Sequence, residues 1–507
     1  MSHWSLPRLS NGIGLLVLFT LGGLLAVLVD LPYGGWIQIS ILSLVWWQIS
    51  KYQSASFKNT FLLGLSFGLG YFALGLWWIF ISLHDVGGMN AILSCLAVFL
   101  LAGLMAIYFA CATLTFHFSR GSFFFGLLLA ASWVVAEYLR GIIFTGFPWM
   151  GFAEAQFNGP FAPIAPFFGG LACTFLAVWI SWEISQLKKN FLLKGACIIS
   201  AIVLTQLASL WTFTKPLGEP LSVRLIQGNF EQSLKFNPKA IEGQFSFYTS
   251  AIESEPADLI ITPETAYPWP QGNLPAGLLG SIQRFSTDTS SNVLLGVIGE
   301  ASNSSEVKYT NRALGLSPNL SSYQYDKSHL VPFGEFIPPG FHWFVNAFHV
   351  PMSDFARGLL DQAPFSIIRS GKETINAAIT ICYEDVFGGE LASRIQHSSK
   401  PVNLLINMTN LAWFGNSQAP TQQLRLSQLR SLETGLPALR ATNTGITAVL
   451  GPDGKILAEL PQFTQGVLRT NIQTYTGSTP YVFWGNAPIL GLSCLLLILG
   501  FIRQRRI

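Results

Sequence analysis

The segment INAAITICYED, residues 375–385, ends an apolar run with a cysteine and two carboxylates. Its first seven residues are mostly apolar or β-branched, which predicts a buried strand over 375–381. The strand stops at Cys382, and the functional residues of α/β folds gather where strands stop. The segment therefore predicts an α/β domain that carries a candidate nucleophile at the end of a strand.

The same alternation of elements continues on both sides of this segment. Strand-like apolar runs occupy 222–227, 258–262, 293–298, 312–316, 321–326, 402–407 and 445–450. Helix-like stretches occupy 239–254, 276–288, 385–397 and 420–436. Gly451-Pro452-Asp453-Gly454 separates two β-prone runs and predicts a hairpin turn. The pattern predicts one layered α/β domain of about 260 residues.

The charged residues divide the 507-residue chain into three parts. Residues 1–213 hold 13 of them, 214–475 hold 39, and the last 32 residues hold three arginines. The whole chain is 50% hydrophobic and 11% charged, with a mean hydropathy of +0.44, whereas about 25% charge is usual in soluble proteins. This composition, with no basic stripe, excludes a disordered or nucleic-acid-binding protein. It predicts a membrane domain over 1–212, a water-soluble domain over 213–484, and a membrane helix with a basic tail over 485–507.

The flanking parts contain apolar runs long enough to cross a bilayer, which takes about 20 residues. Eight spans are predicted, at 11–29, 34–50, 59–83, 89–116, 123–140, 161–187, 191–212 and 485–502. Basic residues accumulate in the loops on one side, which marks that side as cytoplasmic. The short loops on the other side have only Arg140, against Arg8, Lys51, Lys58, Arg120, Lys188, Lys189, Lys194, Arg503, Arg505 and Arg506. Both termini are therefore predicted to be cytoplasmic, and residues 213–484 extracytoplasmic.

Three residues whose side chains are charged or nucleophilic follow predicted strands: Glu264, Lys327 and Cys382. Cys382 is the only cysteine of the predicted soluble domain, so it is either a reactive thiol or a small core residue. A helix is predicted to begin just after it, and a helix N-terminus favours the thiolate. Taken singly, Glu264 could be a helix-start acid and Lys327 a solvated lysine. Together the three supply the base, the cation and the nucleophile that acyl transfer needs.

Three motifs carry a family resemblance: Pro263-Glu264, YDKSHLVPFGE at 325–335, and ICYE at 381–384. Their order and spacing resemble the Glu-Lys-Cys signature of the nitrilase, or carbon–nitrogen hydrolase, superfamily. Seven predicted spans precede this domain, one follows it, and TGFPW lies at 145–149 between the fifth and sixth. With this topology the whole chain resembles the bacterial apolipoprotein N-acyltransferase family.

The resemblance implies an αββα sandwich on the periplasmic side of a bacterial inner membrane, and a ping-pong acyl transfer without a cofactor. Cys382 would attack the sn-1 ester of a phospholipid, typically phosphatidylethanolamine, and hold the acyl chain as a thioester. The N-terminal α-amine of a diacylglyceryl-cysteine lipoprotein would then accept the chain. We expect the enzyme to act as a monomer.

The resemblance also implies roles for the residues of its motifs. Glu264 would act as general base and then as general acid. Lys327, with the backbone N–H of Tyr383, would hold the oxyanion. Glu335 and Glu384 would orient Lys327 and the substrate amine, with the division between them left open.

Aromatic residues are candidates for contact with lipid. The segment 336–348, which includes Phe341 and Trp343, is too aromatic for an exposed soluble loop. It is expected to dip into the membrane interface as a lid or lipid guide, and the alternative is a plug that packs on the core of its own domain. Trp149 and Trp413 are further candidates for substrate contact.

Two positions depart from the family pattern. Phe236 stands where relatives often carry Trp, which keeps an aromatic face for substrate but loses an indole N–H. Leu411 stands where many relatives carry Asp, which puts the polar contacts of the 410–414 loop in doubt.

Polar and small residues of the predicted spans also need interpretation. Glu137 and Arg140 lie three positions apart and could form an ion pair or contact a phospholipid headgroup. Gly64 and Gly68 are predicted to let helices pack closely. The seven histidines are scattered, and no spacing typical of metal ligands occurs, so no metal site is predicted.

Three classes of function remain. The first is a phospholipid-dependent N-acyltransferase. The second is a membrane-tethered amidase or nitrilase-type hydrolase, which would pass the acyl group to water. The third, a receptor or transporter, leaves the three residues that follow strands unexplained and has too few membrane charges for an ion path.

Overall fold

The computed structural model describes residues 11–52, 56–118, 124–188, 190–232, 238–301, 308–338 and 355–504. The chain divides into two compact units. The helical unit comprises Met1–Phe80, Ala91–Leu210 and Asn486–Ile507, and the α/β unit comprises Ile81–Asn90 and Trp211–Gly485.

The helical unit is built from apolar helices. Two of them, Ala91–Phe118 and Phe191–Ala208, are long and apolar enough to cross a membrane, and Phe57–Gly75 with Trp78–Val86, bent by 48°, makes a third if the pair is one span. The prediction of eight spans is supported only in part: within the described residues, length and composition identify two or three. The helices are α1 (Asn11–Leu28), α2 (Gly34–Ser50), α3 (Phe57–Gly75), α4 (Trp78–Ile81), η1 (Ser82–Val86, in the α/β unit), α5 (Ala91–Thr113), α6 (Thr115–Phe118), α7 (Phe125–Arg140), η2 (Ile143–Thr145), α8 (Phe152–Gln156), η3 (Ala162–Ile164), α9 (Ala165–Phe168), α10 (Gly170–Ser185), α11 (Phe191–Ala208) and α18 (Ala487–Gln504).

The span expected at 161–187 is not one helix. Pro163 and Pro166 lie in the first turns of η3 and α9, where a missing N–H is tolerated. Gly169 then takes a φ of +76°, which ends α9 and allows α10 to begin in a new direction. Proline and glycine therefore shorten this apolar run to a helix of 16 residues.

Aromatic rings and close helix contacts fill the core of the helical unit. Phe109 and Trp133 are fully buried, and their ring centroids lie 4.3 Å apart. A Cβ atom at Gly68 would lie 2.8 Å from Cα of Ala106 on α5, and Gly64 is similarly close to the same helix. The predicted packing role of the two glycines is confirmed.

Two mixed sheets form the α/β unit. The seven-stranded sheet has the order β13-β1-β2-β4-β5-β6, with β3 beside β4, and the six-stranded sheet has the order β12-β11-β10-β9-β8-β7. The strands are β1 (Thr214–Gln227), β2 (Leu259–Ile261), β3 (Tyr267–Pro270), β4 (Asn292–Ala301), β5 (Lys308–Leu316), β6 (Tyr323–Asp326), β7 (Phe365–Ile367), β8 (Ile375–Ile381), β9 (Leu404–Thr409), β10 (Ala438–Thr442), β11 (Thr447–Leu450), β12 (Ile456–Leu460) and β13 (Gly466–Gly477). The helices are α12 (Pro238–Glu253), η5 (Gln271–Asn273), α13 (Leu278–Thr289), η6 (Cys382–Val386), α15 (Gly388–Gln396), η7 (Ala412–Phe414), α16 (Ala419–Thr434) and α17 (Pro480–Trp484).

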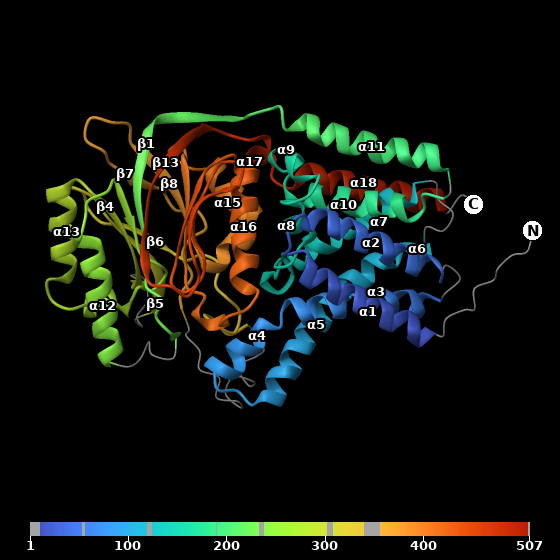
Figure 1. Ribbon diagram of the computed structural model, residues 1–507, viewed down its shortest axis with the longest axis horizontal. Helices are drawn as coiled ribbons and strands as arrows, with labels where there is room; N and C mark the ends of the chain where they lie inside the picture. The colour runs from blue at the N-terminus through green and yellow to red at the C-terminus, as the bar shows by residue number, and fades with distance from the viewer. Residues whose placement is uncertain are drawn as a thin grey trace, which may run out of the picture. The chain divides into compact units, whose positions relative to one another are not determined.

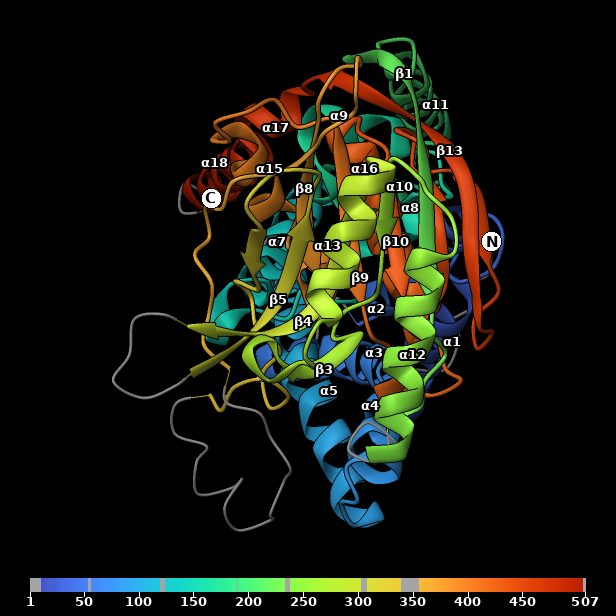
Figure 2. The ribbon, with the colours of Figure 1, turned by 90° about the vertical axis from the view of Figure 1, so that its left-hand side faces the viewer.

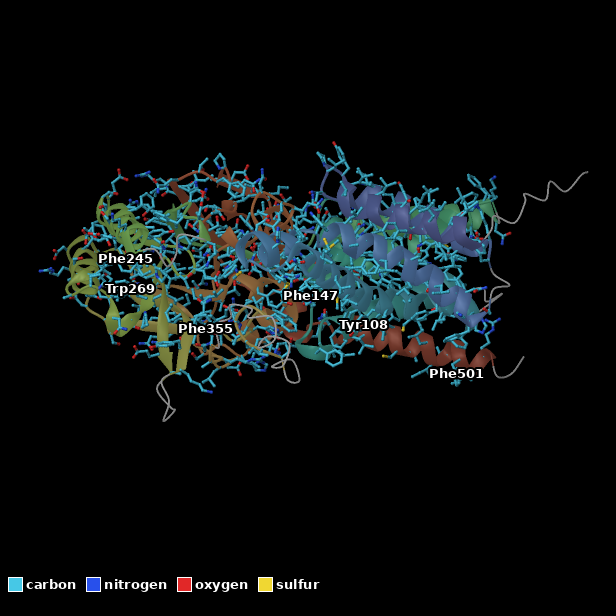
Figure 3. The ribbon with its side chains drawn as sticks, turned by 90° about the horizontal axis from the view of Figure 1, so that it is seen from below. Tyr108, Phe147, Phe245, Trp269, Phe355 and Phe501 are labelled. Carbon is cyan, nitrogen blue, oxygen red and sulfur yellow. The ribbon has the colours of Figure 1, made fainter. Side chains whose placement is uncertain are left out.

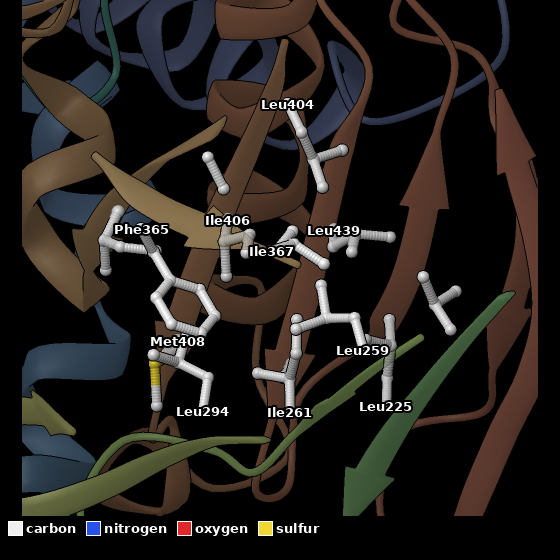
Figure 4. Close-up of a cluster of buried hydrophobic side chains, with 14 of the residues drawn as sticks. Leu225, Leu259, Ile261, Leu294, Phe365, Ile367, Leu404, Ile406, Met408 and Leu439 are labelled. Carbon is white, nitrogen blue, oxygen red and sulfur yellow. The ribbon is translucent and has the colours of Figure 1, made fainter. Parts of the chain in front are cut away.

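The two sheets pack face to face, with helices on both outer faces (Figures 1 and 2). Alternate strand residues, such as Leu225 and Ile406, meet between the sheets (Figure 4). α12 and α13 cover the seven-stranded sheet, and α15 and α16 cover the six-stranded sheet. Phe245 of α12 packs on Trp269 of β3, with ring centroids 5.4 Å apart (Figure 3). The expected αββα sandwich is confirmed.

Each predicted strand of this unit overlaps an observed one, and the Gly451–Gly454 turn joins the antiparallel strands β11 and β12. The helix expected from 385 begins at Gly388, because η6 occupies the preceding turn. Strands β3, β7, β10 and β13 were not predicted, whereas β12 lies in the β-prone run expected after the hairpin turn. β3 and β7 are too short to form an apolar run, β13 is partly exposed, and a buried arginine interrupts β10.

Candidate active site

Cys382 is the first residue of η6 and forms the turn directly after β8. Its φ of +52° lies in the left-handed region, which a residue with a side chain rarely adopts. The turn is held through its carbonyl oxygen, which accepts hydrogen bonds from Gln423 Nε2 at 3.0 Å and Asn407 Nδ2 at 3.4 Å. The residue as a whole is of intermediate exposure, whereas the surrounding protein desolvates its thiol.

Glu264 follows β2, and both oxygens of its carboxylate are fixed. Oε2 accepts the backbone N–H of Asn410 at 2.8 Å, and Oε1 accepts Asn311 Nδ2 at 2.7 Å. The chain around Glu264 can lie against β4 because residue 296 is glycine. A Cβ atom at Gly296 would lie 2.0 Å from the carbonyl oxygen of Pro263. The carboxylate therefore has a defined orientation.

Lys327 follows β6 and is buried between two carboxylates. Its Nζ lies 3.4 Å from Oε1 of Glu264 and 2.8 Å from Oε2 of Glu335, and its side chain is 1% exposed. Burial by itself would lower the pKa of Lys327, but the negative charges of Glu335 and Glu264 outweigh it and raise this pKa above its usual value. Lys327 is therefore a permanent cation in the site.

Cys382 carries a protonated thiol at rest. Burial, and after it the charge of Glu264, raises the pKa of the thiol to about 12. Lys327 and a hydrogen bond with Thr409 lower this pKa without offsetting the increase. The prediction that a helix N-terminus holds Cys382 as a thiolate is wrong, because η6 is a 3-10 helix of five residues and burial dominates. The thiol needs a base.

The structure brings the three residues that follow strands together. Lys327 contacts Glu264, and the charges of both act on the thiol of Cys382. A carboxylate that can accept a proton, a cation that can stabilise an oxyanion and a thiol thus share one buried site. Such a set can perform acyl transfer through a thioester.

The two supporting glutamates have separate places. Glu335 contacts the ammonium group of Lys327, as the orienting role requires. Glu384 instead accepts the backbone N–H groups of Ser328 and Ile381, each at 2.7 Å. Glu384 therefore ties the loop after Lys327 to the turn at Cys382.

Tyr383 is buried directly after Cys382. Its ring packs on Phe387 and His329, with centroids 5.2 and 5.8 Å apart. His329 also contacts Glu390 at 3.2 Å, in keeping with a place in the surrounding loop. Within the described residues, no group of three or more His, Cys, Asp or Glu side chains could hold a metal ion.

Of the four candidate substrate-contact residues of the α/β unit, the structure describes one. Trp413 lies in η7 and is 37% exposed. Phe236, Phe341 and Trp343 lie outside the described residues. The lipid-guide prediction for the aromatic segment therefore stays a prediction.

Glu137, Arg140 and Trp149 are buried in the helical unit. Arg140 Nη1 donates to the carbonyl oxygens of Phe147 and Trp149 at 2.6 and 2.7 Å, and Glu137 accepts the N–H of Phe152 at 3.0 Å. Both residues are described, and no salt bridge joins them, so the predicted ion pair is wrong. Each side chain instead satisfies backbone groups that follow α7, Arg140 in the loop and Glu137 at the first residue of α8, because buried peptide groups need partners.

Sequence reasoning missed Asn311. Its Nδ2 donates to Glu264 Oε1 at 2.7 Å and to Glu335 Oε1 at 2.9 Å, so it bridges the two carboxylates beside Lys327. Asn311 is buried within β5. A buried amide directly before a predicted apolar run is a signal for a site, since it needs polar partners there.

The sequence matches two family models. The carbon–nitrogen hydrolase model matches residues 222–481, and the model of the apolipoprotein N-acyltransferase N-terminal domain matches residues 22–182. Among curated proteins, an apolipoprotein N-acyltransferase from Ralstonia nicotianae is 40% identical over 496 residues, which cover 96% of this chain and 93% of that protein. An apolipoprotein N-acyltransferase from Nitrosomonas europaea is 36% identical, over 92% of this chain and 91% of that protein.

Solved structures also align with part of the chain. A CN-hydrolase superfamily protein from Xanthomonas campestris is 18% identical, and the alignment covers 54% of this chain and 96% of that chain, with a TM-score of 0.36. An amidase from Nesterenkonia sp. is 17% identical, with coverages of 50% and 90% and a TM-score of 0.33.

Proposed function

This chain belongs to the apolipoprotein N-acyltransferase family, and on that premise we propose that Cys382 carries the acyl chain that the enzyme transfers. The donor is a phospholipid, and the acceptor is the N-terminal α-amine of a diacylglyceryl-cysteine lipoprotein. One observation supports this assignment most. Lys327 Nζ lies 3.4 Å from Glu264, and the charges of both residues act on the thiol of Cys382.

The first half-reaction forms the thioester. Because the thiol has a pKa of about 12 at rest, Glu264 takes its proton as Sγ of Cys382 attacks the ester carbonyl carbon. Lys327 Nζ and the N–H of Tyr383 stabilise the oxyanion. The ester C–O bond then breaks, Glu264 gives the proton to the departing alkoxide, and the lysophospholipid leaves.

The second half-reaction forms the amide. The neutral α-amine attacks the thioester carbon, and the same two donors hold the oxyanion. Glu264 accepts a proton from the attacking nitrogen, the C–S bond breaks, and the proton passes to the sulfur of Cys382. Glu335 keeps Lys327 paired while Glu264 is protonated, since Lys327 Nζ lies 2.8 Å from Oε2 of Glu335.

A membrane setting follows from the substrates. We place residues 1–212 and 485–507 in a bacterial inner membrane as eight spans, with both termini cytoplasmic and the catalytic domain, 213–484, periplasmic. The asymmetry of Lys and Arg supports this orientation. Transfer of an acyl chain into water costs about 0.8 kcal/mol per CH₂, so the donor, phosphatidylethanolamine in our proposal, must reach the site from the bilayer. One chain supplies all the groups named above, and we propose a monomer.

Aromatic residues guide the lipid in this scheme. We assign lipid contact to Phe236, Phe341, Trp343 and Trp413. We propose that Trp149, Glu137 and Arg140 instead maintain the conformation of the loop after α7. Replacement of Phe341 and Trp343 by Ser is expected to slow turnover of phospholipid about tenfold, as lost apolar contact predicts. Unchanged turnover would mean that the segment packs on the core of its own domain.

Mass spectrometry of the acyl-enzyme tests the proposal. After incubation with phosphatidylethanolamine, the Cys382 peptide is expected to carry an acyl adduct, which a lipopeptide amine removes as an N-acyl product. Cys382→Ala is expected to abolish the adduct, and Cys111→Ala to retain it. Release of the acyl group to water as fast as to the amine would favour the amidase or nitrilase-type hydrolase, and no adduct on Cys382 would overturn the assignment.

A further inference from the structure

A second group of polar side chains surrounds the turn that bears the nucleophile. Asp385, Asn407, Thr409, Gln423, Ser427 and Arg440 belong to it, and each is at most 4% exposed. The two half-reactions above use none of them. Burial of polar groups is unfavourable unless each finds a partner, so the hydrogen bonds of this group indicate what it holds in place.

Gln423 of α16 is the member that reaches the nucleophile. Its Nε2 lies 3.0 Å from the carbonyl oxygen of Cys382 and 4.0 Å from its sulfur. Its Oε1 accepts Nη2 of Arg440 at 2.7 Å. Since a guanidinium group has donors only, Arg440 forces the amide to present its oxygen to the arginine and its N–H groups to Cys382.

Arg440 of β10 is fully buried, and its surroundings fix it on several sides. Nη1 donates to Ser427 at 2.9 Å and lies 3.6 Å from Oδ2 of Asp385. The cavity beside it measures about 10 Å³, which is room for no more than one water molecule. Burial lowers the pKa of Arg440 to about 10, whereas negative charge on Asp385 and on Cys382 raises it. Because this attraction is mutual, Arg440 favours the thiolate of Cys382.

We propose that Gln423 and Arg440 are positioning residues for Cys382: Gln423 holds the strained turn and donates to the sulfur when negative charge forms there, and Arg440 fixes the direction of that amide. The inference rests on the proposed role of Cys382 as nucleophile. Sulfur gains charge when it attacks the ester and again when it leaves the thioester, so the pair serves both half-reactions.

Alkylation of Cys382 by iodoacetamide tests the pair without any lipid substrate. Mass spectrometry of the Cys382 peptide separates its labelling from that of the other cysteines. The charged groups that act on the thiol are Glu264, Lys327 and Glu335, and Asp385 and Arg440 lie beside the turn. At pH 8 the thiolate is a minor species, because the pKa is about 12. A tenfold change in rate at this pH therefore reports a pKa shift of about one unit.

Three variants divide the contributions. Gln423→Leu removes the donor, and its alkylation at pH 8 is expected to be about tenfold slower than that of the parent protein. Gln423→Glu keeps the size and the acceptor for Arg440 but puts a carboxylate beside the sulfur, and a loss of about a hundredfold is expected. Arg440→Lys keeps the cation but has no fork to orient the amide, and a loss of about threefold is expected. The rate of single-turnover acylation should decrease in the same order of variants. The steady-state KM for phospholipid should stay unchanged.

Arg430→Met is the matched control. Arg430 is another buried arginine, on the same helix as Gln423, and it pairs with Glu433 at 3.0 Å. Its replacement is expected to lower Tm and to leave the alkylation rate unchanged.

The inference is overturned if Gln423→Glu alkylates at the parental rate, or if Arg430→Met slows alkylation as much as the Gln423 variants do. Should Gln423→Leu fail to fold, Gln423→Glu decides, since it preserves shape. Failure of the proposed function would look different: the parent protein would form no acyl adduct on Cys382, whatever the alkylation rates.

Discussion

The two sheets of the α/β unit meet at the active site, and they control charge in different ways. The ionic region, on the seven-stranded sheet, consists of Glu264, Lys327 and Glu335, which pair directly. The amide region, beside the six-stranded sheet, holds the carbonyl of Cys382 with the neutral side chains of Gln423 and Asn407. Proton transfer needs groups that can change their charge, whereas a strained turn needs partners that do not. The molecule assigns these tasks to different sheets.

Glu384 is the link between the two regions. It lies in η6, yet it accepts the N–H of Ser328 beyond β6 as well as the N–H of Ile381 at the end of β8. The hydroxyl of Tyr325 also donates to it, at 2.8 Å. A carboxylate that accepts several donors makes charge-assisted hydrogen bonds, which are stronger than neutral ones. The relative position of the ammonium group and the thiol therefore depends on this residue.

Lys327→Met should have the largest effect, because it removes the cation of the ionic region and leaves Glu264 and Glu335 unpaired. Loss of an oxyanion donor costs about 10²–10³ in rate, and loss of one partner of a buried ion pair costs about 3–5 kcal/mol. We expect thioester formation, followed by mass spectrometry, to fall about 10³-fold, and Tm to decrease. Lys372→Met, which removes an exposed lysine paired with Glu219 at 2.8 Å, should change neither. Normal acylation by Lys327→Met would shift the oxyanion role to the amide region.

Glu384→Gln tests the link. Glutamine keeps the size of the side chain but turns an NH₂ group toward the N–H of Ser328 or of Ile381, so a buried donor loses its acceptor. We expect a loss of about 2 kcal/mol in stability and a fall of about 10²-fold in single-turnover acylation, as for a misplaced reacting group. Glu390→Gln is the control. Glu390 pairs with His329 and is the more exposed residue of that pair, so this substitution should have little effect. Equal losses in the two variants would contradict the linking role.

Gly296→Ala disturbs the ionic region from a distance. The added Cβ atom would lie 2.0 Å from the carbonyl oxygen of Pro263 and 2.6 Å from the backbone nitrogen of Thr265, so the segment that carries Glu264 must shift. We expect acylation to slow about tenfold in single-turnover measurements. Gly280→Ala in α13 meets no atom within 4 Å and should raise stability by up to about 1 kcal/mol. An unimpaired Gly296→Ala enzyme would mean that the carboxylate tolerates displacement.

The sequence predicted the three candidate residues of the site because each lies in a short local pattern. Glu264, Lys327 and Cys382 all follow strands, and β8 has the predicted bounds. The amide partner of Cys382 could not be found this way. Gln423 lies 41 residues after Cys382, on a helix that the sequence placed without indicating which side chains face the site. Only the packing of that helix on the sheet brings the amide to the turn.

Burial of the thiol and a single glycine caused the other differences between sequence and structure. A helix start after Cys382 suggested a thiolate, but desolvation is a property of the whole fold and outweighs the local dipole. In the helical unit, hydropathy marked 161–187 as one span, whereas the backbone of Gly169 ends a helix within it. An average over an apolar window does not register a single residue with a positive φ.

The smallest expected effect is on the pH dependence of stability, in which Cys382 and Lys327 should act over different pH ranges. Burial raises the pKa of Cys382 from 9.0 to about 12. For Lys327, burial is outweighed by Glu335 and Glu264, which raise its pKa above 10.5. In both cases the native state keeps a proton that the unfolded chain loses. The contribution of the two groups to the free energy of unfolding is therefore fully present below pH 9 and decreases as pH rises. Each group contributes a slope of at most about 1.4 kcal/mol per pH unit. Thermal unfolding in detergent from pH 8 to about 11 should show that Cys382→Ala removes the decrease that begins near pH 9.0 and leaves the decrease above 10.5. An unaltered curve for Cys382→Ala would mean that its thiol ionises as readily in the native state as in the unfolded chain.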